Sequence, residues 1–73
     1  RRLLMLDLLP AEVKSAFNTS YAGAAVLKVE KETEDSGDVF EIKFLFEGKL
    51  HQVSYSASGE VESVKVHGEP DDD

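Results

Sequence analysis

The chain has 73 residues, fifteen of them acidic and eight basic, for a formal net charge of −7, and it contains no cysteine. Its length allows one small domain with little room for a deep catalytic cleft, and no disulfide is available to stabilise it. The acidic balance disfavours nucleic acid as a partner, and no apolar run reaches the roughly 20 residues that a bilayer span requires.

Residues 1–9 (RRLLMLDLL) combine a basic start with a short apolar run that Asp7 interrupts. This is how a secretion signal begins, but no small-residue cleavage site follows. We interpret residues 1–9 as an N-terminal apolar segment: a strand, a helix extension or a truncated leader. Residues 10–67 are predicted to form the domain, and residues 68–73 (GEPDDD) a disordered acidic tail.

One amphipathic helix is predicted after Pro10, a residue that suits the first helical turn. Val13, Ala16 and Phe17 follow at i, i+3 and i+4, the spacing of one helix face over about three turns. Gly23 is a suitable left-handed stop after it.

Residues 38–56 (DVFEIKFLFEGKLHQVSYS) are predicted to form two strands joined by a two-residue turn at Glu47–Gly48. Successive strand side chains alternate between faces, so apolar residues at every second position share one face. The first strand has four such residues: Phe40, Ile42, Phe44 and Phe46. The turn sets Phe44 opposite His51, and a helix has to cover this face.

Residues 25–33 are predicted to form a strand before this hairpin. A turn at residues 34–37 sets Thr33 opposite Asp38, which places Leu27 beside Phe44 and turns Val26 to the other face.

A last strand follows Ser58–Gly59. A two-residue loop there aligns Val64 with Val53 and turns Val61 outward, whereas a bulge after Gly59 would shift the register by one. The predicted fold is α+β, with one amphipathic helix packed on a four-stranded antiparallel meander of order 1-2-3-4.

The order of these signals resembles the PepSY-like domains, also described as β-lactamase-inhibitor-like domains. The resemblance runs from about Leu9 to Val66 and rests on these features: Leu9-Pro10-Ala11-Glu12-Val13 opening a helix, Phe17, Tyr21, Gly23-Ala24, Lys28-Val29-Glu30-Lys31, the aromatic-rich strand, and Tyr55 before Ser58-Gly59. Ala22 stands where the family usually has proline, and Ser58 where it usually has aspartate. The resemblance implies an exported bacterial protein, periplasmic or extracellular, that binds or inhibits other proteins and has no catalytic residues.

The chain lacks a recognisable catalytic or metal-binding pattern. His51 is expected to face the helix and His67 the opposite side, so the two imidazoles cannot share an ion. Four acidic residues surround the first turn, Glu32, Glu34, Asp35 and Asp38, and a weak calcium site there is the alternative to a solvated turn. No serine has a histidine and a carboxylate placed to activate it. We therefore predict a protein that is not an enzyme and has no cofactor.

The outer sheet face, opposite the helix, is the predicted protein-binding surface. An apolar row across three strands is expected beside a charged row and then an acidic and hydroxyl-bearing row, with Val39 and Val61 beyond. The predicted binding residues are Val26, Lys28, Glu41, Lys43, Leu45, Leu50 and Gln52. The alternatives are that the leucines of residues 3–9 cover the stripe, that two copies bury it in a weak homodimer, that it is only solvated, or that the chain is a structural or regulatory segment of a larger protein.

Overall fold

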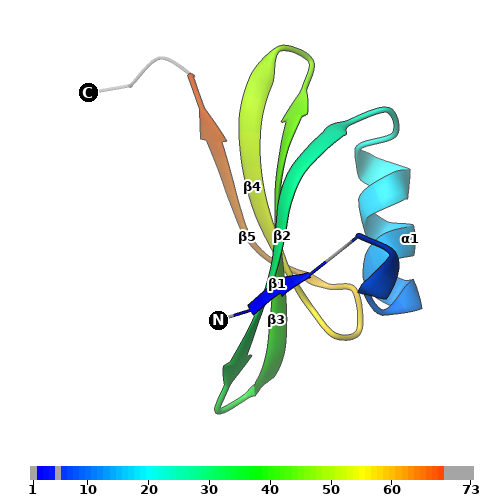
Figure 1. The fold of residues 1–73 in the computed structure, drawn as a ribbon, viewed down its shortest axis with the longest axis vertical. Helices are drawn as coiled ribbons and strands as arrows, with labels where there is room; N and C mark the ends of the chain where they lie inside the picture. Colours follow the sequence, from blue (N-terminus) through cyan, green and yellow to red (C-terminus); the bar gives the residue numbers. More distant parts are fainter. Residues whose placement is uncertain (1, 5, 69–73) are drawn as a thin grey trace.

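The computed structural model describes residues 2–4 and 6–68, so the predicted tail beyond Gly68 lies outside the described residues. In chain order the elements are β1 (Arg2–Leu4), the 3-10 helix η1 (Leu6–Leu8), α1 (Ala11–Ser20), β2 (Ala25–Glu34), β3 (Gly37–Phe46), β4 (Lys49–Ser56) and β5 (Val61–His67). The strands form one antiparallel sheet of order β1-β2-β3-β4-β5, with α1 lying on one side of it (Figure 1). The predicted helix and four-stranded meander are confirmed, and β1 adds a short fifth strand at the β2 edge.

Helix α1 begins after Pro10, whose carbonyl accepts a hydrogen bond from the Lys14 N–H at 3.0 Å. It buries Val13 and Phe17, the residues that the helical spacing assigned to the sheet side. It ends at Tyr21, whose N–H donates to the Phe17 carbonyl, and the chain turns away through Gly23 at φ +85°. A positive φ suits glycine, which has no Cβ to clash.

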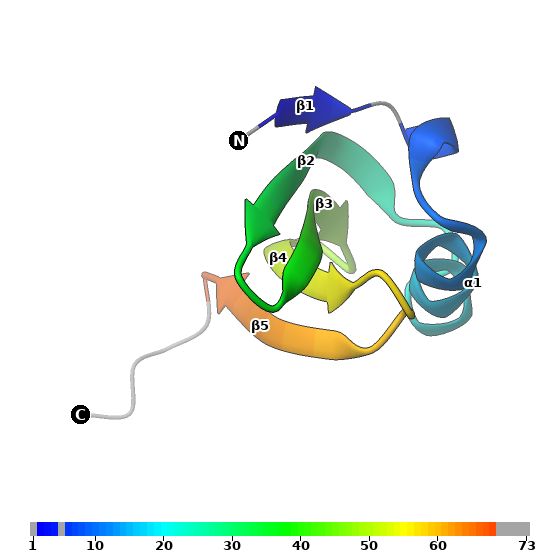
Figure 2. The same cartoon turned by 90° about the horizontal axis from the view of Figure 1, so that it is seen from below.

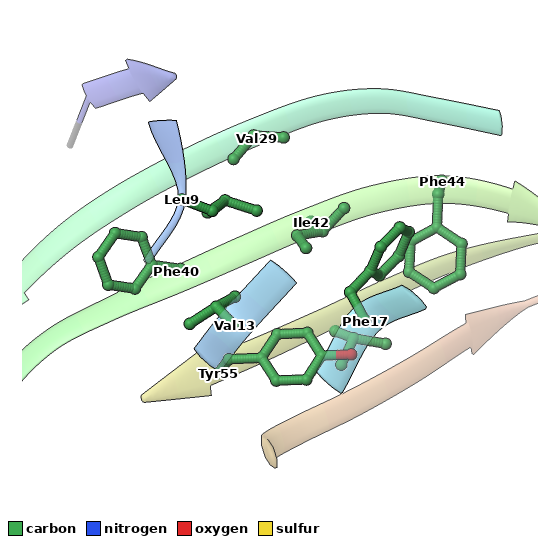
Figure 3. Close-up of a cluster of buried hydrophobic side chains, with 9 residues drawn as sticks. Leu9, Val13, Phe17, Val29, Phe40, Ile42, Phe44 and Tyr55 are labelled. Atoms are coloured by element: carbon green, nitrogen blue, oxygen red, sulfur yellow. The ribbon is translucent and has the colours of Figure 1, made fainter. Parts of the chain in front are cut away.

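The core lies between α1 and the sheet (Figure 3). Leu9, Val13 and Phe17 come from the helical side, and the strands contribute Val29, Phe40, Ile42, Phe44, Val53 and Tyr55. Phe44 is fully buried, with its ring centroid 4.9 Å from that of Phe17 and 5.1 Å from that of His51. The predicted inward direction of the alternating apolar residues of β3 is therefore confirmed.

The hairpin of β3 and β4 has the predicted register throughout. Phe44 pairs with His51, and Phe46 pairs with Lys49 across the turn. Glu47 and Gly48 have φ of 53° and 80°, which matches the two positive values of a type I′ turn.

The pairing of β2 with β3 contains a bulge that corrects two predictions. Thr33 pairs with Asp38 as predicted, but Val26 pairs with Phe44 and Lys28 with Lys43, so Leu27 is the extra residue. The prediction that Leu27 lies beside Phe44 is wrong, because Leu27 is 55% exposed. The outward direction of Val26 is also wrong, since Val26 is half-buried against the core.

The pairing of β4 with β5 combines two irregularities that compensate each other. The loop has three residues, 57–59, and the Ser56 N–H donates to the Glu60 carbonyl across it. A bulge follows, since Tyr55 pairs with Val61 but Ser54 with Ser63. The longer loop and the bulge cancel, so Val64 pairs with Val53 as predicted, whereas the outward direction of Val61 is wrong.

The N-terminal segment joins the sheet edge and the core. β1 pairs antiparallel with β2, and Leu6 and Leu9 pack on the helix side, while Leu8 is 66% exposed. Of the leucines of residues 3–9 that could have covered the outer stripe, Leu6 and Leu9 therefore do not, and the side chains of residues 3 and 4 lie outside the described ones. In the described part of the chain, neither helix has the length and apolar character needed to cross a membrane.

Candidate protein-binding site

The outer face is the sheet surface that α1 does not cover (Figure 2). Strand pairing orders its side chains into rows. The row that crosses the middle of the face contains Lys28, Lys43, Gln52 and Lys65. The next row contains Glu30, Glu41, Ser54 and Ser63. Both rows have the predicted members. On β2, β3 and β4 the two turns determine the register, and on β5 the longer loop and the bulge cancel.

The apolar row has a different and smaller member on β2 than predicted. Leu45 pairs with Leu50, and Leu45 is 44% exposed, but its partner on β2 is Ala25 instead of Val26. The β2 bulge causes this difference because it reverses the direction of every residue before Leu27. Of the seven predicted binding residues, Val26 is thus the one that leaves the outer face.

The two charged rows surround a shallow hollow of about 110 Å³, lined by Lys28, Glu30, Glu41, Lys43 and Gln52. Glu30 is only 6% exposed, and its carboxylate lies 3.4 Å from the Lys28 ammonium. A buried carboxylate is unfavourable without such partners. The sequence identified this row but gave no signal for the burial of Glu30, which lies between β1 and β3 and so has a strand on each side.

Polar contacts connect β4 and β5 beside the hollow. The Nε2 atom of His67 lies 2.6 Å from Gln52 Oε1, which accepts its hydrogen, and the hydroxyls of Ser54 and Ser63 are hydrogen-bonded. His67 was predicted to face outward, but its contact with Gln52 was not foreseen, because the two residues are fifteen positions apart.

The two histidines lie on opposite faces, as predicted. His51 stacks on Phe44, and its Nδ1 donates to the Lys49 carbonyl at 3.0 Å. Within residues 2–4 and 6–68, no group of three or more histidine, aspartate or glutamate side chains is arranged to hold a metal ion. At the acidic turn, Asp38 instead pairs with the Lys31 ammonium at 3.6 Å and accepts a hydrogen bond from Thr33.

Tyr55 has the most perturbed titratable group described. Its hydroxyl is buried under α1 without a hydrogen-bond partner among the described residues (Figure 3). Burial raises the pKa of Tyr55 to about 12, with a smaller contribution from nearby Tyr21. The ring is 1% exposed, so this hydroxyl belongs to the core and not to an accessible site.

Comparison with family models finds no match, and comparisons with curated proteins and with solved structures also find none.

Proposed function

We propose that this domain is a non-enzymatic binding module of the PepSY-like kind, which engages a protein partner through its outer sheet face. The resemblance described above suggests an exported protein that works in the periplasm or outside the cell, with an inhibitory role as one form of such binding.

The observation that carries this proposal is that one face of the sheet is covered by other parts of the chain and the opposite face is not. Helix α1 and residues Leu6 and Leu9 all pack on one face, and Leu45 remains 44% exposed on the other. An apolar pair beside ordered charge has the composition of a protein interface, with an apolar part and a polar rim. Leu45 and Leu50 are the apolar pair, and the lysine row supplies the rim.

The test compares substitutions that place a negative charge at exposed positions. Leu45→Glu and Lys43→Glu are expected to abolish capture of the partner from a cell-envelope extract, while circular dichroism reports an intact fold. Leu8→Glu is the matched control, because Leu8 is also well exposed but lies on η1. Capture that survives both outer-face substitutions would contradict the proposal.

A second candidate is a structural or regulatory segment of a larger protein, or a self-associating domain. The exposure of Leu8, Val61 and Val64 away from the outer face favours it, since each is more than half exposed. Sedimentation and amide exchange of the isolated chain distinguish the candidates. A monomer in which the Leu9 amide is protected supports the outer-face proposal, and a dimer or a loss of capture with Leu8→Glu supports the alternative.

A further inference from the structure

Two pairs of like charges lie directly opposite one another on the outer face. Lys28 pairs with Lys43, and Glu30 pairs with Glu41, two residues further along β2. Opposite charges at such positions stabilise a sheet, and like charges destabilise it. An exchange of Glu41 and Lys43 would give two lysine–glutamate pairs at the same net charge, so the observed order is the less stable one.

The charges of β3 are also available to an external group. The Lys28 ammonium is paired along its own strand with Glu30. Within residues 2–4 and 6–68, by contrast, neither Glu41 nor Lys43 forms an ion pair. Both line the hollow with Gln52, and the hollow is shallow, with a volume of about 110 Å³, so the charged ends of side chains can reach it from a segment that lies across it.

The charges around the hollow therefore form a positive half and a negative half. Two lysines lie on one side of the hollow, two glutamates lie on the other, and the two halves are two residues apart along each strand. Two residues of extended chain span about 6.8 Å. Local rules that a chain breaks at the expense of its own stability are expected at functional sites.

We infer that the hollow receives an extended protein segment that carries an acidic and a basic residue two positions apart. Lys43 binds its carboxylate and Glu41 binds its ammonium or guanidinium group, while Lys28 and Glu30, paired with each other, give each half its second charge. Side chains two apart in an extended segment lie on the same face and have the spacing of the two rows. This inference rests on the proposed function of the outer face and specifies the chemistry of the partner.

The first test concerns stability and needs no partner. The double variant Glu41→Lys with Lys43→Glu keeps the net charge and replaces both like-charge pairs by opposite-charge pairs. We expect its Tm to rise by a few degrees. A Tm equal to or below that of the parent would overturn the inference, because the observed charge order would then carry no cost.

The second test uses three synthetic peptides as probes: acetyl-Ala-Glu-Leu-Lys-Ala-amide and the versions with Glu-Leu-Glu and Lys-Leu-Lys at the centre. In an NMR titration of the ¹⁵N-labelled chain, the Glu-Leu-Lys peptide should give saturable shifts at Lys28, Glu41, Lys43 and Gln52. We expect at least fivefold weaker binding of the two control peptides, at least fivefold weaker binding of the first peptide to the double variant, and weakening by salt.

The outcomes separate this inference from the proposed function. If all three peptides shift outer-face amides equally, in parent and double variant alike, the inference is overturned and the outer face remains a binding surface. Absence of outer-face shifts with the Glu-Leu-Lys peptide also overturns the inference, whereas the proposed function fails on the Leu45→Glu capture experiment.

Discussion

Consecutive residues of β3 belong to two surfaces that are built differently. Phe44 has no exposed area and contacts the rings of Phe17, Tyr21 and His51, whereas Leu45, the next residue, is 44% exposed on the outer face. On the helix side, residue choice follows packing. On the outer side, two like-charge pairs are retained at some cost to the sheet. The comparison teaches that packing accounts for the residues of the helix side, whereas it does not account for the like-charge pairs of the outer face, where we propose a binding role.

Truncation of Phe44 should have the largest effect. Phe44→Ala removes a fully buried ring from the centre of the aromatic cluster, at a cost of about 3 to 5 kcal/mol, which would largely unfold a small domain. Urea and thermal melts followed by circular dichroism measure this. Leu45→Ala is the control on the other face and should change the unfolding free energy by about 0.5 kcal/mol or less. A Phe44→Ala melt within a few degrees of the parent would contradict the assignment of the core.

Alanine substitutions at two glycines test how closely the loop before β5 packs against helix α1. A Cβ at Gly59 would lie 2.7 Å from the Glu12 carbonyl oxygen in α1, and its φ is +89°. Gly48 has a φ of +80° but nothing within 4 Å of the added Cβ. Gly48→Ala should therefore cost about 1 kcal/mol from backbone strain alone, and Gly59→Ala roughly 2 to 3 kcal/mol, because the loop must move away from the helix. An equal loss of unfolding free energy in the two variants would show that the loop at Gly59 does not pack closely against α1.

The smallest effect at neutral pH concerns the Tyr55 hydroxyl. Because the pKa of Tyr55 is raised to about 12, the unfolded chain loses this proton near pH 10 while the folded chain keeps it. The folded state then binds more protons, so stability falls as the pH rises from about 10 to about 12. In Tyr55→Phe, the unfolding free energy should not show the decrease that this hydroxyl causes between pH 10 and 12. At pH 7 it should be about 1 kcal/mol higher than in the parent, since the hydroxyl has no described partner.

Two measurements check this prediction. Urea melts of the parent and of Tyr55→Phe across pH 9 to 12 give the difference in slope. In Tyr21→Phe, Tyr55 is the one remaining tyrosine, so the phenolate absorbance reports its titration directly. A midpoint near pH 10 in the folded Tyr21→Phe variant would be inconsistent with a buried hydroxyl.

The sequence predicted the structure best where the alternation of apolar residues along a strand and the adjoining turn imply the same strand register. The four apolar residues of β3 and the Glu47–Gly48 turn each imply the same register, and that register also determines the two charged rows. Around Leu27 the pattern was ambiguous, because Val26 and Leu27 are both apolar and either can face the core. The bulge resolves this in favour of Val26.

Three other features depend on contacts between residues that are far apart in the sequence, which no local sequence pattern predicts. β1 has three residues, too few for an alternation, and it forms only because the edge of β2 is open to it. The longer loop before β5 and the bulge at Glu62 cancel, so the predicted alignment of Val64 was correct although the predicted loop was not. Glu30 is buried between β3 and β1, and β1 was not predicted to join the sheet, so the sequence identified the residues of the candidate site but not its shape.

A nuclear Overhauser spectrum of the native chain tests directly which side chains of the sheet face the helix and which lie on the outer face. Ring protons of Phe44 should give strong cross-peaks to Phe17 and Tyr21, and Val26 methyls should give cross-peaks to core protons, while Leu45 methyls should give none to α1. Cross-peaks from Leu45 to the helix, or a Phe44 ring without contacts to it, would contradict the account.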